Sequence, residues 1–226
     1  MKKIAILGSA PSSKALAPFS DPSWEMWVCS NANSDLPRAD VVFELHDVEI
    51  FEAMPQLAGY MDWLKHQKKV YMIEKLDRYP TSEEYPKARM IEKFGPYFFS
   101  SSIAWMMALA IDQKPDTIGL FGIDMTASEE YAFQRPGCQY FIQKCLDLGI
   151  KLIVPPQSDI AQPAPLYGYK EADRNYRKAF VRRQELQERL NEEMTKIREA
   201  TKVRMHIEGA LDDLEYHIQT WAYQGK

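Results

Sequence analysis

The sequence predicts an α/β fold: a mostly parallel sheet sandwiched by helices, followed by a C-terminal extension of long helix. Up to about residue 165, short apolar runs alternate with amphipathic stretches. The apolar runs show little polar alternation, which is typical of central strands buried on both faces of a parallel sheet. From about residue 170 to 223 there is no proline, and apolar residues recur at helical spacing.

Six apolar runs are the expected strands, and three amphipathic or apolar stretches between them are the expected helices. Strands that alternate with helices imply a layered α/β sandwich. The expected strands are Ile4–Leu7, Glu25–Cys29, Val41–Leu45, Lys69–Ile73, Thr117–Phe121 and Lys151–Val154. The expected helices are Ile50–His66, Ser101–Asp112 and Arg135–Leu148.

The composition changes at Pro155-Pro156, which divides the chain into a domain over 1–165 and a helical extension over 166–226. The extension is either two helices that break near Gly209 or one long helix whose apolar stripe meets another subunit. Its spacing is too irregular for a clear heptad repeat. We expect a homo-oligomer formed through these helices; the alternative is that they only brace the sheet.

The composition excludes several classes of protein. A net charge of −4 argues against a protein that coats nucleic acid, and no stretch is long and apolar enough to span a membrane. The three cysteines, an odd number without CxxC spacing, indicate reduced thiols and a cytoplasmic location. No pair of histidines or cysteines has metal-ligand spacing, so no structural metal site is expected.

The first candidate site is the turn that follows the first strand, where Gly8, Ser9, Pro11 and Ser12 stand close together. Ligands of open α/β sheets bind at the carboxyl ends of strands, and a glycine there lets a phosphate or ribose approach the backbone. The turn lacks the further glycines of a dinucleotide fingerprint and the Gly-Lys-Ser/Thr of a P-loop. The alternative is a simple strand-to-helix turn capped by a serine.

Two further groups of small polar residues sit at predicted element ends. Asn31 and Asn33 follow the second strand and are suited either to reading ribose hydroxyls or a base edge, or to an Asx-turn. Ser101 and Ser102 open the apolar helix, whose N-terminus offers free N–H groups to an anion. We expect all four residues to contact a ligand.

Titratable residues follow the third and fifth strands. His46 can serve as an acid or base near neutral pH, or it can cap the next helix together with Asp47. Asp124 can bind a hydroxyl or a divalent metal, or cap a turn, while Tyr131 and Arg135 can reach phosphate oxygens. The four candidates for catalysis are therefore His46, Asp124, Tyr131 and Arg135.

Taken in order, these motifs resemble those of bacterial sialyltransferases of the Campylobacter type. The motifs are the GxxPS turn, an Asn after the second strand, the Ser-rich helix start, and I-x-L-x-G-I-D-M followed by Tyr131-Ala132. The order is also similar to that of archaeal hydroxymethylpterin diphosphokinase-like proteins, and to many phage proteins. The resemblance covers about residues 3–160 and implies a Rossmann-like nucleotide-binding domain from a phage, acting in the host cytoplasm.

The resemblance implies that the ligand is a nucleotide or nucleotide sugar. Gly8, Ser9 and Ser12 would line its phosphate and ribose, Asn31 and Ser101 or Ser102 would contact the nucleotide, and Tyr131 would assist the leaving phosphate. The chain lacks a histidine between His66 and His206, where that family has its catalytic one.

A glycosyltransferase-like transferase is the first hypothesis that follows. The alternatives are a phage protein that sequesters a nucleotide without turnover, a Mg²⁺-dependent pyrophosphoryl transferase with Asp124 and Asp47 as ligands, and a scaffold.

Overall fold

The computed structural model describes residues 1–29, 31–125, 129–162 and 174–221, with the side chains of 31, 129–131 and 174–181 left out. It has two compact units, Met1–Gln162 and Pro163–Lys226. The first is an α/β sandwich with a seven-stranded sheet in the order β5-β4-β3-β2-β1-β6-β7. Every neighbouring pair of strands runs parallel. The predicted fold class is confirmed.

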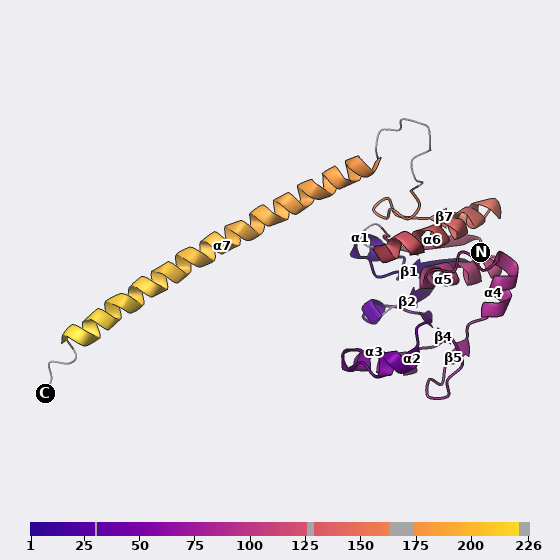
Figure 1. Cartoon of the computed structure of the whole chain (residues 1–226), viewed down its shortest axis with the longest axis horizontal. Coiled ribbons are helices and arrows are strands. Elements are labelled where there is room, and N and C mark those ends of the chain that lie inside the picture. The colour runs from indigo at the N-terminus through magenta and orange to yellow at the C-terminus, as the bar shows by residue number, and fades with distance from the viewer. Residues whose placement is uncertain (30, 126–128, 163–173, 222–226) are drawn as a thin grey trace. The chain divides into compact units, whose positions relative to one another are not determined.

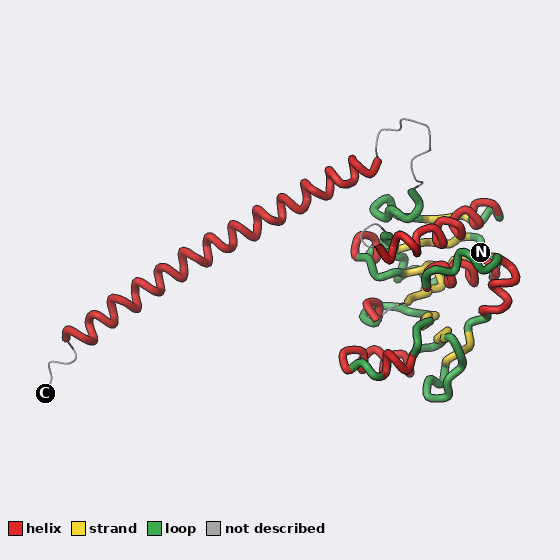
Figure 2. Tube along the Cα trace, in the orientation of Figure 1, coloured by secondary structure: helices red, strands yellow, loops and turns green. Residues whose placement is uncertain are grey.

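The elements of the first unit alternate between strand and helix along most of the chain (Figures 1 and 2). The strands are β1 (Lys3–Leu7), β2 (Trp24–Cys29), β3 (Val41–Glu44), β4 (Val70–Met72), β5 (Ser82–Glu84), β6 (Thr117–Phe121) and β7 (Lys151–Ile153). The helices are α1 (Pro11–Lys14), α2 (Val48–Glu52), α3 (Ala58–Lys65), α4 (Lys87–Phe94), α5 (Ser102–Asp112) and α6 (Glu129–Asp147), with short 3₁₀ turns η1 (Asn31–Asn33) and η2 (Pro55–Leu57).

Strand residues alternate between two hydrophobic layers, one on each face of the sheet. In β1, Ile4 and Ile6 pack into the layer that contains α5 and α6, whereas Ala5 and Leu7 pack into the layer that contains α3. All four are fully buried. Burial on both faces explains why the strand sequences are continuously apolar.

The order of the strands creates a crossing point beside β1. The chain adds β2, β3, β4 and β5 outward on one side of β1 and then returns to place β6 on the other side. In such sheets the loops at the carboxyl ends diverge at this point and leave a crevice for a ligand. The loops after β1 and β6 flank it here.

The structure differs from the sequence prediction mainly in short elements. All six predicted strands are present, and β5 is an additional strand of three residues that begins with Ser82 and continues with Glu83 and Glu84. The predicted helix over Ile50–His66 is interrupted: α2 ends at Glu52, and Pro55 starts the turn before α3. A proline cannot donate the backbone hydrogen bond that a continuous helix needs at that position.

The second unit contains α7 (Arg174–Trp221), a single helix of 48 residues (Figure 1). It runs through Gly209 without a break, so of the two arrangements considered for the extension the single long helix is the one formed. No helix in the described part of the chain is both long and apolar enough to cross a membrane.

Candidate functional site

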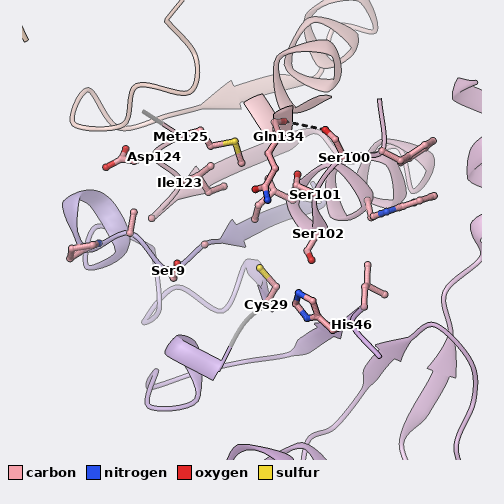
Figure 3. Close-up of a pocket in the computed structure, with 18 residues that line it drawn as sticks. Ser9, Cys29, His46, Ser100, Ser101, Ser102, Ile123, Asp124, Met125 and Gln134 are labelled. Atoms are coloured by element: carbon pink, nitrogen blue, oxygen red, sulfur yellow. Dashed lines mark hydrogen bonds between the residues drawn. The ribbon is translucent and has the colours of Figure 1, made fainter. Parts of the chain in front are cut away.

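A pocket of about 830 Å³ lies at the carboxyl ends of the central strands, within the size range of small-molecule sites (Figure 3). The loop after β1 contributes Gly8 to Pro11, and the loop after β6 contributes Gly122 to Met125. The first residue of α5 and the two residues before it contribute Ser100 to Ser102, and the loop after β3 contributes Leu45 and His46. The pocket therefore occupies the crevice that the strand order creates.

Gly8 and Gly122 allow the two central loops to approach closely. The Gly8 N–H donates to the Phe121 carbonyl at 2.9 Å, and a Cβ at Gly8 would lie 2.4 Å from the Gly122 oxygen. Gly122 has φ of +63°, and its N–H donates to Ser13 Oγ at 2.9 Å. Any side chain at Gly8 would push β1 and β6 apart, so this glycine serves the sheet as well as the pocket.

The serines at the start of α5 form the polar end of the pocket. Ser101 is the N-cap, and its hydroxyl accepts from the Ala104 N–H at 3.1 Å. Ser102 is the first residue of the helix, and its hydroxyl points into the pocket (Figure 3). The first N–H groups of a helix, together with its dipole, favour a negatively charged group. This end of the pocket is suited to a phosphate.

The backbone of α6 positions this serine segment through Gly137. A Cβ at Gly137 would lie 2.3 Å from the Phe98 carbonyl oxygen and 2.7 Å from Ser100 Oγ. Ser100 Oγ also donates to the Gln134 carbonyl at 3.4 Å. The segment before α5 is therefore packed directly on the backbone of α6, a contact that the periodicity of the sequence does not predict.

We predict that Gly137→Ala displaces the serine segment. The added Cβ meets a backbone carbonyl, which cannot move without shifting the start of α5, whereas an alanine at the open position Gly59 meets nothing within 4 Å. The Gly137→Ala variant should lose at least about 1 kcal/mol of stability and bind pocket ligands more weakly. Chemical denaturation and calorimetry on both variants test this; a Gly137→Ala variant identical to Gly59→Ala would contradict it.

His46 is held by a buried carboxylate at the end of β3. Its Nδ1 lies 2.5 Å from Glu44 Oε1, and its ring stacks on Phe51 with centroids 4.8 Å apart. Glu44 is fully buried and also accepts from the Tyr60 hydroxyl at 2.7 Å through Oε2. Burial and the charge of Glu44 raise the pKa of Tyr60 above its ordinary range, so the phenol stays protonated and donates.

The Glu44 carboxylate orients the His46 ring through Nδ1. When Glu44 is ionised and the imidazole is neutral, Nδ1 is the donor and Nε2 is the acceptor. The His46 side chain is 54% exposed, lines the pocket and lies below Ser102 in Figure 3. An imidazole that a carboxylate orients at the edge of a cavity is suited to proton transfer with a ligand.

Asp124 also lines the pocket. Figure 3 shows it well apart from His46, beside Ile123. Its Oδ1 is buried and has no hydrogen-bond partner among the described residues. A buried carboxylate oxygen without a partner is costly. Asp124 thus brings to the pocket wall a carboxylate of which one oxygen has no partner among the described residues.

Cys29 lines the pocket, but its thiol is not a reactive one. Burial raises the pKa of its thiol to about 12, and the nearby Glu44 charge acts in the same direction. Burial likewise raises the pKa of Cys145 to about 12 and of Cys138 to about 11. All three thiols are therefore protonated at neutral pH, and Cys29 is not a nucleophile.

These thiols predict a specific pH dependence. The unfolded chain releases the thiol protons near pH 9.0, whereas the folded chain keeps them to about 12 for Cys29. The contribution of the protonated thiols to the stability of the folded chain is therefore complete below pH 9.0, the pKa in the unfolded chain. It is lost as the pH rises from 9.0 to about 12, the pKa of Cys29 in the folded chain. The free energy of unfolding should fall in alkaline solution, and iodoacetamide should modify the thiols rapidly only in urea. Rapid modification of the folded chain would contradict this.

Two predicted site residues act on the loops around the pocket instead of lining it. Arg135 Nη1 lies 3.1 Å from Asp159 Oδ2, and the guanidinium also donates to the Met125 carbonyl at 3.3 Å. Asp159 is almost fully buried. Asn33 donates through Nδ2 to the Cys29 carbonyl at 2.7 Å and the Gly8 carbonyl at 3.2 Å. Both side chains tie together loops that form the pocket wall.

The remaining predicted residues are placed as follows. Gly8, Ser9, Pro11, Ser101, Ser102, His46 and Asp124 come together around the pocket. Ser12 lies on α1, exposed and outside the lining. Asn31 and Tyr131 lie on η1 and α6, and their side chains are outside the described residues.

The described residues contain no cluster of three His, Cys, Asp or Glu side chains that could hold a metal. Asp47, the second expected Mg²⁺ ligand, is the N-cap of α2, where it accepts from the Glu49 and Ile50 N–H groups. Asp124 alone of the two faces the pocket. Mg²⁺-dependent pyrophosphoryl transfer stays a prediction from the sequence.

Comparison with known proteins gives a likeness of fold. No protein-family model matches the sequence, and no curated protein matches it. The structure is similar to the Campylobacter jejuni sialyltransferase CstII in complex with CMP-3FNeuAc (TM-score 0.48, 17% identity, 68% of this chain and 80% of that chain). It is also similar to Bacillus subtilis thiamine pyrophosphokinase (TM-score 0.42, 14% identity, 68% and 60%). These values describe shared architecture only.

Proposed function

We propose that the pocket binds a nucleotide or nucleotide sugar and that the chain is a glycosyltransferase-like transferase. The observation that carries the proposal is the pairing, in one cavity, of the helix N-terminus at Ser102 with the carboxylate-held His46. The first suits a phosphate and the second suits proton transfer. Transfer from a phosphate-linked donor to a hydroxyl is accelerated by both.

The residues divide between binding and chemistry in this proposal. The start of α5 and the loop after β1 would hold the phosphate, with Ser9 and Ser102 as hydroxyl donors. Asp124 would accept from a ribose or sugar hydroxyl at the other end. His46 Nε2 would take the proton from the acceptor hydroxyl, while Nδ1 remains hydrogen-bonded to Glu44. The negative charge that develops on the departing phosphate would be stabilised by the helix N-terminus.

A thermal-shift screen of nucleotides and nucleotide sugars, with and without Mg²⁺, tests the proposal. A ligand at about 100 times its Kd adds roughly 2.7 kcal/mol to stability. Cytidine-5'-monophosphate is the first probe, because one structure of similar fold was solved with it. A shift with a cytidine or uridine sugar, followed by hydrolysis or transfer, supports a transferase. A shift without turnover supports sequestration, and the absence of any shift overturns nucleotide binding.

We also propose that the chain self-associates through α7. The large apolar residues of this helix from Leu186 to Trp221 are 45% to 70% exposed, an unusual state for so many in one helix. A helix of this length with an apolar stripe on one face gains stability when the stripe packs on another helix. Sedimentation of the full chain over a range of concentrations measures the association.

A further inference from the structure

The apolar stripe of α7 follows a regular seam once the helix is traced through Gly209. Starting at Leu186 and stepping alternately four and three residues, the seam reads Leu, Leu, Glu, Ile, Ala, Arg, Ile, Leu, Leu, Ile and Trp, ending at Trp221. This is the spacing of a coiled-coil core. Met194 and Val203 are apolar residues next to the charged seam positions 193 and 204, so the heptad repeat is difficult to recognise in the sequence.

Two charged residues, Glu193 and Arg204, interrupt the seam, and both are exposed. In the single chain each makes only a local surface pair: Glu193 Oε1 with Lys196 at 2.8 Å, and Arg204 with Glu208 at 3.5 Å. Burying a charge without an opposite partner is costly. The way in which two seams pair must therefore satisfy both charges.

We propose that two copies of the chain pair through α7 as an antiparallel coiled coil in which Glu193 of each copy meets Arg204 of the partner subunit. The proposal rests on the self-association proposed above and adds its partner, direction and register. A parallel pair would place Glu193 against Glu193 and Arg204 against Arg204. The antiparallel pair replaces these two repulsions with two ion pairs.

The same register is supported by the apolar residues. When residue 193 faces 204 of the partner subunit, Leu186 faces Leu211, Leu190 faces Ile207, and Ile197 faces Ala200. Residues 176 and 221 then face each other, so that the overlap takes in nearly all of α7. A shift by one heptad in either direction leaves both charges facing apolar residues. One register thus pairs Glu193 with Arg204 and matches the apolar residues between Leu186 and Leu211. Nearer the ends of the overlap Arg183 faces Leu214, where its long side chain can extend to solvent.

A charge swap in the full chain tests the pairing. Glu193→Arg and Arg204→Glu should each weaken dimerisation at least about tenfold, because each replaces two interfacial ion pairs with two like-charge contacts. The double variant Glu193→Arg/Arg204→Glu should restore it. In a parallel pair each single change merely exchanges one like-charge contact for another, so unaffected single variants would overturn the proposal. Circular dichroism checks that the helix remains intact.

Spin labels on the face opposite the seam measure the direction. Cysteines at Glu188 and Tyr216 would be separated from their copies along the axis by about 32 Å and about 52 Å in the antiparallel register, at 1.5 Å per residue. A parallel pair would give about 20 Å at both positions, the width of two helices. Short distances at both, or a monomer at all concentrations, would overturn the proposal. Nucleotide affinity should be the same in these variants as in the wild-type chain, because the pocket lies in the first unit. This measurement therefore tests the pocket independently of the pairing of α7.

Discussion

Replacing His46 with Gln is expected to lower transfer turnover by about 10²- to 10⁴-fold, the usual contribution of a positioned general base. Glutamine retains a polar side chain of similar length but cannot take up a proton near neutral pH. The start of α5 is untouched, so nucleotide affinity should change little. Steady-state kinetics together with calorimetric titration separate the two effects.

His66 provides the matched control for this experiment. It is the C-cap of α3 and interacts through Nδ1 with the Asp62 carbonyl at 2.9 Å, and it does not line the pocket. His66→Gln should leave both turnover and affinity unchanged. Equal turnover in the His46→Gln and wild-type proteins would remove His46 from the chemistry, and the transferase proposal would then need another base.

Replacing Glu44 with Gln is expected to lower turnover about as strongly, although Glu44 does not reach the ligand. Glu44 Oε1 also accepts from the His46 backbone N–H at 3.1 Å, so the amide oxygen of Gln takes this position and still accepts from Nδ1. The variant instead removes the negative charge that stabilises the imidazolium formed when Nε2 takes up the proton. A glutamine also fits the fully buried site with little change of volume. The readout specific to positioning is a changed pH profile of turnover with unchanged nucleotide affinity.

Tyr60→Phe is the matched control for Glu44→Gln. It removes the 2.7 Å hydrogen bond to Oε2 but leaves the Glu44 charge and the bond to His46 in place. We expect a loss of about 1–3 kcal/mol in stability from the unsatisfied carboxylate oxygen, with turnover much closer to wild type. Equal losses of turnover in the two variants would indicate a general packing defect.

The sequence predicts the central sheet well because each strand is buried on both faces. Continuous apolar runs such as Thr117–Phe121 therefore stand out with correct ends. Strand β5 does not, since its residues are Ser82, Glu83 and Glu84 and two of the three are exposed. It lies at the edge of the sheet, where pairing with β4 alone decides the structure. Such a strand leaves no hydrophobic pattern.

Part of the candidate site could also be predicted. His46 and Asp124 were identifiable because polar residues directly follow apolar strands, and such residues meet at one edge of a parallel sheet. The partners that define their chemistry could not be identified. Tyr60 reaches Glu44 from a helix 16 residues later, and the Arg135–Asp159 pair joins a helix to a proline-rich loop. These contacts depend on tertiary packing, which periodicity does not report.

A pair of substitutions at Ser102 tests whether the start of α5 holds the phosphate of a nucleotide. Ser102→Asp puts a negative charge at the first position of the helix, where it favours the helix itself but repels a phosphate. Ser102→Asn has nearly the same shape without the charge. Calorimetric titration with cytidine-5'-monophosphate or the best nucleotide found should show Ser102→Asp binding about 10- to 100-fold more weakly than Ser102→Asn. Equal affinities of the two variants would contradict phosphate binding at the start of α5.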